Sequence, residues 1–390
     1  MDLPLERLDA RIKSANADGF LLDDDSSNGD QRYLSGLNGH DPFITLYVPD
    51  EIHLLIGGTD YNRANAESNA QDVARLSEYD YETKQKENPK TAKYDALSEF
   101  LTERGVDSVV VPERFPHGTA CGLRTNGIDV TTDGDDTLQK VRAVKTDEEI
   151  AAIESAQRAT EAGMKRAETL LSESDIEDGV LVYEGQALTG NKVKSAIEIT
   201  LLEHGAALHD TIVACGGESA NPHGQTSGPL RPNESIVIDI FPKHLETGYH
   251  SDMTRTFVKG EPNQRLRQLY DEVNEALDIA LKTVQAGVTG DEVNDRVFTF
   301  FEEAGHQSRR KDKDIEGGAL HYIGHGVGLD VHELPVCLPG GDELEPGNVI
   351  TLEPGLYYSG VGGVRIEDVI EVTDDGYRNL TEYHKQFVIE

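Results

Sequence analysis

The stretch HYIGHGVGLDVHELP, residues 321–335, contains three histidines, three glycines, one aspartate and one glutamate. A stretch of this composition can be a phosphate-binding glycine loop, a metal site or a turn-rich connection. Its glycines follow neither GxxxxGKS/T nor GxGxxG, and VHELP does not begin a helix, so a phosphate loop is disfavoured. The zinc-protease motif HExxH is also absent, because Leu, Pro and Val follow His332 and Glu333. The neighbouring segments decide between the two remaining interpretations.

Upstream of this stretch, two strand-like segments each carry an aspartate within an apolar pattern. ESIVIDI contains Asp239, and GYHSDMTRTFV contains Asp252. The segment FPKHLETG between them is typical of a hairpin loop. If the turn centres on Leu245 and Glu246, the two aspartates lie opposite each other across the strand pair. Like charges that face each other in this way are destabilising unless a positive group lies between them.

Downstream, a second pair of segments repeats the arrangement with glutamates. NVITLEPGLYY contains Glu353 and GVRIEDVIEV contains Glu367, with a glycine-rich turn between them. A turn centred on Gly360 places Glu353 opposite Glu367. A lone acidic residue in such a strand is usually exposed to solvent, but two mirrored pairs in apolar sequence indicate a buried cluster.

These four carboxylates and His325 predict a metal site. Four half-buried carboxylates on one sheet would repel each other and take up protons unless cations held them. The glycines that flank His325 allow the backbone to approach closely, and its imidazole adds a nitrogen ligand. An oxygen-rich set with one imidazole suits two ions such as Mn²⁺ or Co²⁺ better than metals that prefer thiolates. Two cations bridged by carboxylates and a water molecule are used for two-metal hydrolysis.

Taken together, IVIDI, SDMTRTF, GHGVGLDVHE, TLEPGLY and VRIED resemble the motifs of the M24 metallopeptidases of the pita-bread fold. They are most similar to those of Xaa-Pro aminopeptidases and prolidases. The resemblance extends over nearly the whole chain, including VRAVKTDEEI at residues 141–150. It implies an α/β (α+β) fold: a creatinase/prolidase-like N-terminal α/β domain, residues 1–137, and a pita-bread catalytic domain, residues 138–390, with a curved antiparallel sheet. The acidic break TTDGDDT separates the two.

The resemblance also implies a set of functional residues. The metal ligands would be Asp239, Asp252, His325, Glu353 and Glu367. Asp252 and Glu367 would bridge two divalent cations, Mn²⁺ first, with Co²⁺ or Zn²⁺ as alternatives. Glu353 would also be catalytic, because it touches both metal and water and can shuttle a proton.

Four more residues match family positions around the substrate. His223 and His332 would be both catalytic and substrate-binding, since they can stabilise charge that develops on the carbonyl oxygen. His321 would line the substrate pocket, and Arg365 would lie beside the bridging glutamate and contribute to substrate binding. The alternative for each of the three histidines is a buried structural role. Asp239 and Asp252 lie 13 positions apart, wider than the commonest family spacing, which leaves the rim of the site and the preferred substrate length open.

The implied activity is hydrolysis, through a metal-bridging hydroxide, of the bond between an N-terminal residue and proline. Peptides with proline in second position would be the substrates of a homodimeric Xaa-Pro aminopeptidase or Xaa-Pro dipeptidase. A methionine aminopeptidase-like enzyme is the nearest alternative, but the additional N-terminal domain argues against it. A non-catalytic pita-bread binding protein and a metal-free creatinase-type enzyme are disfavoured, because all five ligand positions are filled.

The amino-acid composition limits the kinds of partner and the cellular compartment that we expect. Asp and Glu outnumber Lys and Arg by 72 to 36, which gives a formal net charge of −36 spread along the chain. A surface this acidic opposes nucleic-acid binding, and it indicates a halophilic, haloarchaeal adaptation to concentrated salt rather than a basic partner. No segment approaches the roughly 20 apolar residues of a membrane span, and the start lacks a signal peptide. Three scattered cysteines suit a reducing cytoplasm.

The helical pattern is clearest after the acidic break. Thr146 precedes three acidic residues and is placed to cap a long helix. Further helices are predicted over residues 191–205, 263–285 and 291–304. At the start of the chain, LPLERLDARIKSANADG predicts a helix that ends at Gly19.

Overall fold

The structure is a computed structural model that describes residues 3–208 and 210–390. The chain divides into two compact units, Met1–Arg142 and Ala143–Glu390. Helix α7 (Thr137–Ala143) ends at the boundary between the two units along the chain, and the predicted division after residue 137 lies at its start. Arg142 in this helix donates a hydrogen bond of 2.6 Å to Asp30, which ties α7 to the first unit.

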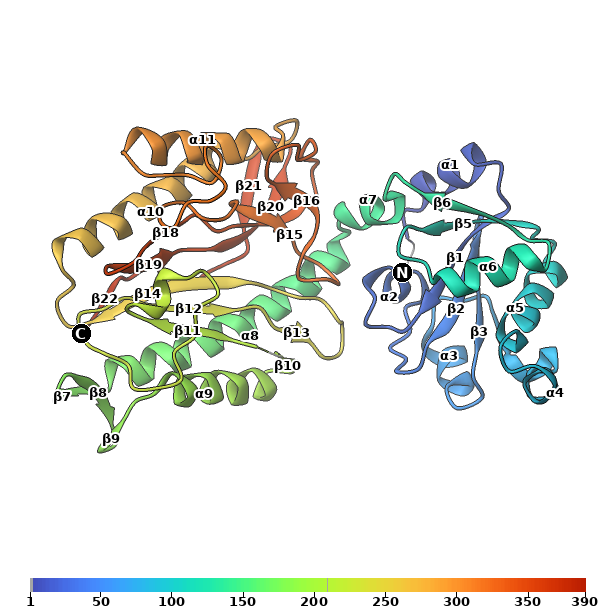
Figure 1. The fold of residues 1–390 in the computed structure, drawn as a ribbon, viewed down its shortest axis with the longest axis horizontal. Coiled ribbons are helices and arrows are strands. Elements are labelled where there is room, and N and C mark those ends of the chain that lie inside the picture. Colours follow the sequence, from blue (N-terminus) through green and yellow to red (C-terminus); the bar gives the residue numbers. More distant parts are fainter. Residues whose placement is uncertain (1–2, 209) are drawn as a thin grey trace. The chain divides into compact units, whose positions relative to one another are not determined.

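The first unit is built around a six-stranded mixed sheet in the order β4-β3-β2-β1-β5-β6 (Figure 1). The β1–β2 and β2–β3 pairs are antiparallel, and the other three pairs are parallel. The strands are β1 (Gly19–Asp24), β2 (Phe43–Val48), β3 (Glu51–Ile56), β4 (Asp72–Arg75), β5 (Ser108–Pro112) and β6 (Asp129–Asp133). The helices are α1 (Glu6–Ser14), α2 (Gly29–Ser35), α3 (Tyr61–Glu67), α4 (Tyr81–Glu87), α5 (Ala92–Glu103) and α6 (His117–Thr125), with a 3₁₀ turn at Leu76–Tyr79.

The first helix is shorter than predicted. It ends at Ser14, and Gly19 already belongs to β1, so the predicted end at Gly19 is wrong. Asn16 adopts a positive φ of 53°, which turns the chain out of the helix. The Asp18 carboxylate then accepts a hydrogen bond from the backbone N–H of Ser108 and starts the pairing of β1 with β5. Pairing with the sheet therefore overrides the helical pattern of the last residues.

The second unit begins with the long helix α8 (Asp147–Ser172), and its predicted N-cap is confirmed. The Thr146 side chain accepts a hydrogen bond from the backbone N–H of Glu149, whose carboxylate accepts one from the backbone N–H of Thr146. Two N–H groups that a helix start leaves unpaired are satisfied by this capping box. The helices predicted further along are also confirmed, as α9 (Gly190–Glu203), α10 (Gln264–Thr283) and α11 (Gly290–Glu303).

The strands of the second unit form two main sheets that are mostly antiparallel. One has the order β11-β12-β14-β22, and the other β16-β15-β17-β20-β21. The first contains β11 (Ile212–Cys215), β12 (Ile236–Ile240), β14 (Met253–Lys259) and β22 (Val388–Ile389). The second contains β15 (Gly324–Gly326), β16 (Glu333–Cys337), β17 (Val349–Leu352), β20 (Asp368–Thr373) and β21 (Gly376–Asn379).

Shorter ladders complete the unit. Strands β18 (Gly355–Tyr358) and β19 (Gly362–Arg365) form a hairpin. Strands β10 (Ala206–Ala207) and β13 (Lys243–His244), which are distant in sequence, form a short antiparallel ladder, and β7 (Asp175–Glu177), β8 (Val180–Tyr183) and β9 (Gln186–Ala187) form a small three-stranded sheet. A 3₁₀ turn spans Glu218–Ala220. No helix of the described chain is long and apolar enough to cross a membrane.

Two apolar cores give the second unit a repeated arrangement. Residues of α8 and α9 pack with β11, β12 and β14 in one core, and residues of α10 and α11 pack with β17, β18, β19 and β20 in the other. Figure 1 shows the strands of this unit between these two helix pairs. Asp239, Asp252, Glu353 and Glu367 belong to neither core, and all four line a cavity of the second unit.

Candidate metal centre

The first hairpin has a different register from the predicted one. Asp239 faces Thr254, not Asp252, because β12 and β14 pair with Ile240 opposite Met253. Lys243 bridges His250 across the loop, so the turn centres one residue later than predicted. The resulting shift is two residues along one strand. Since side chains two apart share a face of a strand, Asp252 and Asp239 still lie on the same side as diagonal neighbours.

The register of the second hairpin agrees with a turn centred on Gly360. Leu352 faces Asp368 in one ladder, and Gly355 faces Arg365 in the next. Glu353 and Glu367 occupy the break between these two ladders, where they do not pair with each other's backbone. The Glu353 N–H bonds to the carbonyl of Ile323 at 2.7 Å, and the Glu367 N–H bonds to the carbonyl of Thr254 at 3.1 Å. The break therefore joins the second hairpin to both β14 and the segment before His325.

The glycines of the opening stretch have a steric role. A Cβ atom on Gly324 would lie 2.0 Å from the carbonyl oxygen of Thr351, and one on Gly326 would lie 2.3 Å from that of Leu334. Strand β15 thus fits between β16 and β17 only because these residues have no side chain. His325, between them, projects from the centre of this closely packed segment. The glycines of the 321–335 stretch therefore allow three strands to pack closely, and this packing fixes the position of the His325 imidazole.

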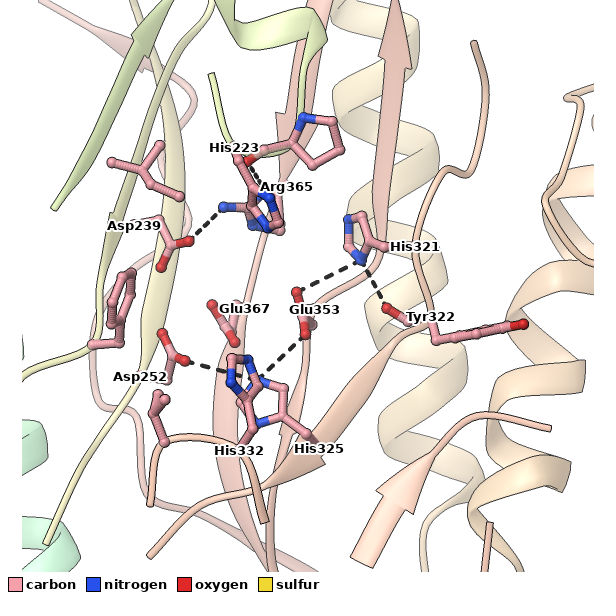
Figure 2. A pocket seen from close by; sticks show the side chains of 14 residues that line it. His223, Asp239, Asp252, His321, Tyr322, His325, His332, Glu353, Arg365 and Glu367 are labelled. Carbon is pink, nitrogen blue, oxygen red and sulfur yellow. Dashed lines mark hydrogen bonds and ion pairs between the residues drawn. The ribbon is translucent and has the colours of Figure 1, made fainter. Parts of the chain in front are cut away.

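All nine predicted site residues line one cavity of about 270 Å³. They are His223, Asp239, Asp252, His321, His325, His332, Glu353, Arg365 and Glu367. The remaining lining residues, which the sequence reasoning did not single out, are Ile212, Pro222, Phe241, Tyr322 and Val331. Figure 2 shows four carboxylates that point into a common space, with His325 and His332 at one end and Arg365 at the other.

Several donor atoms in this cavity are close enough to share a cation. One oxygen each of Asp252 and Glu367 and one nitrogen of His325 lie within 4.8 Å of one another. The Nε2 atom of His325 is 3.6 Å from Oε1 of Glu353 and 3.9 Å from Oδ2 of Asp252. The Oδ1 atoms of Asp239 and Asp252 are buried and have no hydrogen-bond partner in the described chain. Buried acceptors without a partner are costly, and a cation would satisfy them.

The pKa values of the cavity carboxylates also favour a bound cation. Burial, followed by repulsion from neighbouring carboxylates, raises the pKa of Asp252 and of Glu367 well above the ordinary values. Burial raises the pKa of Glu353 to about 8, although Arg365 opposes the shift. Without cations the cluster would therefore retain protons at neutral pH. Carboxylates that are buried together in this way fit divalent cations, which would restore their charged form.

The imidazole of His325 has the chemistry that a metal ligand requires. Burial, and then the neighbouring His332, lowers its pKa to about 3, so the imidazole is neutral at pH 7. Its Nδ1–H donates to the carbonyl of Gly326 at 3.1 Å, which leaves the Nε2 lone pair free to face the carboxylates. A backbone partner on one ring nitrogen is a common way of fixing the tautomer of a metal-binding histidine.

Arg365 fixes one side of the cavity. Its Nη2 atom donates to Oδ2 of Asp239 at 2.5 Å, and its Nε donates to the Thr254 hydroxyl at 3.1 Å. Its Nη1 donates to the Tyr357 hydroxyl at 2.8 Å and to the carbonyl of Pro222 at 3.2 Å. Burial disfavours the charge, but Tyr357 and the surrounding carboxylates outweigh burial and raise the pKa of Arg365 well above its ordinary value.

Thr254 and Tyr357 support the site but were missed from sequence. The Thr254 hydroxyl donates to Oε2 of Glu367 at 2.7 Å, and the Tyr357 hydroxyl bonds Nε2 of His321 at 2.8 Å. For Thr254 a signal existed, because it lies two residues after Asp252 and must share its face of the strand. The sequence contains no comparable signal for Tyr357, since its apolar surroundings in TLEPGLYY are those of a core residue.

The three predicted histidines other than His325 lie at different depths in the cavity. His321 is held from both ring nitrogens, by the carbonyl of Tyr322 at 2.7 Å and by the Tyr357 hydroxyl. Burial, and then Arg365, lowers its pKa to about 3. His223 and His332 are exposed at the mouth. The His332 ring contacts the His325 ring edge to face, with centroids 4.2 Å apart.

Comparison with known proteins agrees with this architecture. The sequence model of metallopeptidase family M24 matches residues 151–374. The Xaa-Pro dipeptidase of Pyrococcus horikoshii is 31% identical over 320 residues, which cover 80% of this chain and 84% of the relative. The crystal structure of the prolidase from Pyrococcus horikoshii OT3 superposes with a TM-score of 0.79 at 26% identity, covering 98% of this chain and 99% of that chain.

A second solved structure gives the same result. The X-Pro aminopeptidase from Thermotoga maritima MSB8 has a TM-score of 0.79 at 26% identity, over 97% of this chain and 100% of that chain. Both structures extend over essentially the whole chain, so the likeness includes the first unit as well as the second. The fold class predicted from the sequence is confirmed.

Proposed function

The chain belongs to metallopeptidase family M24, and we propose that it hydrolyses the bond between an N-terminal residue and proline with the help of two divalent cations. One observation carries the proposal. Two hairpins and the strand of His325 bring four carboxylates and one neutral imidazole to a single cavity, where two buried carboxylate oxygens have no partner in the described chain. The similarity to the Xaa-Pro dipeptidase of Pyrococcus horikoshii supports the choice of substrate.

The residues that would hold the cations are Asp239, Asp252, His325, Glu353 and Glu367. Such an oxygen-rich set with one imidazole favours Mn²⁺, with Co²⁺ or Zn²⁺ as alternatives. When bound, two cations supply Lewis acidity, which lowers the pKa of a water molecule and polarises the scissile carbonyl. The protein contributes by fixing one oxygen of each of two ligands: Arg365 binds Asp239, and Thr254 binds Glu367.

Glu353 is the proposed proton carrier. Its carboxylate lies in the cavity with its oxygens 3.6 Å from His325 and 3.7 Å from His321, both of which are neutral imidazoles at pH 7. A carboxylate buried beside neutral groups has a raised proton affinity, so it can take a proton from water and pass it to the leaving nitrogen of proline. His223 and His332, at the mouth, are placed to donate hydrogen bonds to the carbonyl oxygen as negative charge develops there.

The lining of the cavity bears on substrate choice. Ile212, Phe241 and Val331 provide apolar surface suited to a proline ring. Arg365 is the one residue with a permanent positive charge among the described lining residues, and its charge is already paired with Asp239 while its other hydrogen bonds go to protein atoms. A carboxylate directly after proline would find no unpaired cation of this lining. We therefore expect peptides that continue beyond proline to be accepted at least as well as dipeptides.

The remaining expectations from the sequence also stay proposals. We propose a homodimeric enzyme that works in the cytoplasm of a salt-rich cell. A methionine aminopeptidase-like activity is the alternative. The two activities differ in their substrates, because one requires proline after the scissile bond and the other requires methionine before it.

The test is reconstitution of metal-free protein with Mn²⁺, Co²⁺ or Zn²⁺ at high salt. The assay uses Ala-Pro, Ala-Pro-Ala and Ala-Ala-Ala, together with Met-Ala-Ala for the alternative. The proposal expects activity that depends on added metal, cleavage of both proline peptides and much slower cleavage of the others. Preferential cleavage of Met-Ala-Ala would support the alternative, and no metal-dependent cleavage of any peptide would refute the proposal.

A further inference from the structure

A fully buried ion pair lies beside the cavity but contributes no group to it. The Lys145 ammonium donates to Oε1 of Glu333 at 2.7 Å, and the two side chains are 0% and 4% exposed. Lys145 precedes α8, whereas Glu333 begins β16 and directly follows His332. Removing both charges from water costs about as much as their attraction returns, so such a pair is a weak source of stability. Its position next to His332 calls for another explanation.

The lysine projects from a fixed backbone. The Lys145 N–H donates to the carbonyl of Gly347 at 2.9 Å, and Val144 forms a β-bridge with Asn348. The Asn348 side chain in turn donates to the carbonyl of Ala143 at 2.9 Å. This segment is therefore anchored to the turn that leads into β17, the strand that precedes Glu353. Because its backbone is anchored and its side chain is fully buried, the Lys145 ammonium group has a fixed position.

The glutamate organises the turn that carries His332. Its second oxygen, Oε2, accepts a hydrogen bond from the backbone N–H of Asp330 at 3.3 Å. A Cβ atom on Gly328 would lie 2.3 Å from Oε1, so the turn passes directly over the carboxylate. The Gly328 N–H also bonds to the carbonyl of Asp330 at 3.1 Å. The backbone of residues 328–333 thus closes around the group that Lys145 holds.

The His332 ring depends on this backbone for its position. Its side chain makes no hydrogen bond within the described chain, and its ring packs against the ring of His325. By contrast, His321 and His325 are each held by a backbone carbonyl. A side chain without hydrogen-bonded support is oriented by its own backbone and by packing alone, and small displacements of a reacting group are costly.

The first turn of α8 anchors the other side of the cavity as well. The Glu149 carboxylate accepts a hydrogen bond of 2.7 Å from the hydroxyl of Tyr249, which lies in the loop before Asp252. Further along α8, Thr160 bonds Ser251 at 2.6 Å, and both residues are buried. Lys145 and helix α8 therefore contact two loops beside the site, the loop before Asp252 and the 328–333 turn.

From this geometry we propose that Lys145 and Glu333 are positioning residues, which hold the 328–333 turn so that His332 reaches the scissile carbonyl. The inference rests on the proposed function, because it assigns the pair to the same reaction. It predicts an effect on turnover that is transmitted through His332 alone. Glu333 lies opposite Gly326, next to the proposed ligand His325, so metal content is measured on the same samples and should not change if the effect passes through His332.

The test is a double-mutant cycle. The Lys145→Met/Glu333→Met variant replaces the pair with side chains of similar length and leaves no buried charge unpaired, so it should fold. We expect its kcat for Ala-Pro-Ala to fall by about 10- to 100-fold, the loss typical of a group displaced by about 1 Å, with KM changed by less than about threefold. In a His332→Ala background the same two substitutions should lower kcat by less than about threefold, because their effects share one residue.

Two further variants make the result decisive. Arg310→Met/Glu302→Met removes an ion pair of 2.6 Å elsewhere in the same unit and should leave kcat within about twofold. Gly328→Ala displaces the Glu333 carboxylate without removing a charge, and it should reproduce the kcat loss if the methionine pair does not fold. Unchanged kcat in the methionine pair, or an equal loss with and without His332, would overturn the inference. Inactivity of the metal-loaded wild type would instead refute the proposed function.

Discussion

Each of two cavity carboxylates is fixed by one oxygen and free at the other. Oδ2 of Asp239 binds Arg365 while its Oδ1 has no partner in the described chain, and Oε2 of Glu367 binds the Thr254 hydroxyl. A carboxylate that is oriented in this way needs little rearrangement when a cation arrives. Arg365 brings positive charge to one end only, so most of the negative charge in the cavity is left for the cations to balance.

His332 gives the sharpest prediction at this scale. We expect His332→Ala to retain the full metal content, because its ring binds none of the carboxylates, and to lower kcat by roughly 10²–10³-fold, the usual loss for one donor to a developing oxyanion. Metal analysis and steady-state kinetics on one preparation provide the check. A variant that loses metal together with activity would place His332 among the ligands instead.

At the scale of elements, the hydrophobic and capping patterns predicted the helices more accurately than the turn residues predicted the hairpin registers. Helices α9, α10 and α11 and the Thr146 cap follow from periodicity and local side-chain hydrogen bonds, so they were predictable. The register of the first hairpin was not, because the Lys243–His250 bridge within its loop moves the turn by one residue. The second hairpin could be predicted because Gly360, with φ of 78°, marks its centre.

The residues that line the cavity could be singled out from the sequence for a related reason. Asp239, Asp252, Glu353 and Glu367 interrupt apolar strands, which is visible in the sequence, and their face survives a register shift of two. Tyr357 could not be found, because its role arises from a contact with His321, which lies 36 positions away along the chain, and from one with Arg365 across a hairpin in which Tyr357 itself looks like a core residue. The pairing of Lys145 with Glu333 is of the same long-range kind.

A pH-dependent prediction concerns the packing of α10 against the segment after α11. His306 is buried, with Nδ1 bonded to the Tyr358 hydroxyl at 2.7 Å and Nε2 to Glu272 at 2.9 Å. Burial lowers its pKa below 6.5 despite Glu272. The unfolded chain therefore binds a proton that the folded chain does not, and this stabilisation is complete above pH 6.5 and lost as the pH falls below it.

Urea unfolding of metal-free protein at pH 7, 6 and 5 measures this contribution. Several other buried histidines act in the same direction, so the comparison is with His306→Gln. Relative to wild type, the variant should lose free energy of unfolding less steeply on acidification, by up to about 1.4 kcal/mol per pH unit for one proton. Parallel pH profiles for the two proteins would show that His306 does not titrate with folding.

For the whole molecule, the net charge of −36 is the dominant physical property. Its acidic residues are spread over both units rather than gathered in a tail, so the folded chain repels itself over its entire surface. Salt shortens the range of this repulsion, from about 10 Å at 0.1 M to about 3 Å at 1 M. Salt weakens the repulsion among the cavity carboxylates less, because buried charges are screened less than exposed ones.

We accordingly expect the melting temperature to rise as KCl increases from 0.1 M to several molar. Thermal unfolding followed by circular dichroism across this range is sufficient. A flat or falling curve would contradict adaptation to salt and would favour a basic partner as the reason for the acidic surface.

The central claim is that two cations held by the two hairpins and His325 perform the hydrolysis. The most direct test measures bound metal and cleavage of Ala-Pro-Ala on the same samples of wild type and Glu367→Ala. We predict two cations per wild-type chain and metal-dependent cleavage. In Glu367→Ala, a lost bridging ligand should reduce metal content and lower kcat by several orders of magnitude. If Glu367→Ala bound two cations and cleaved the peptide at the wild-type rate, the account would be contradicted.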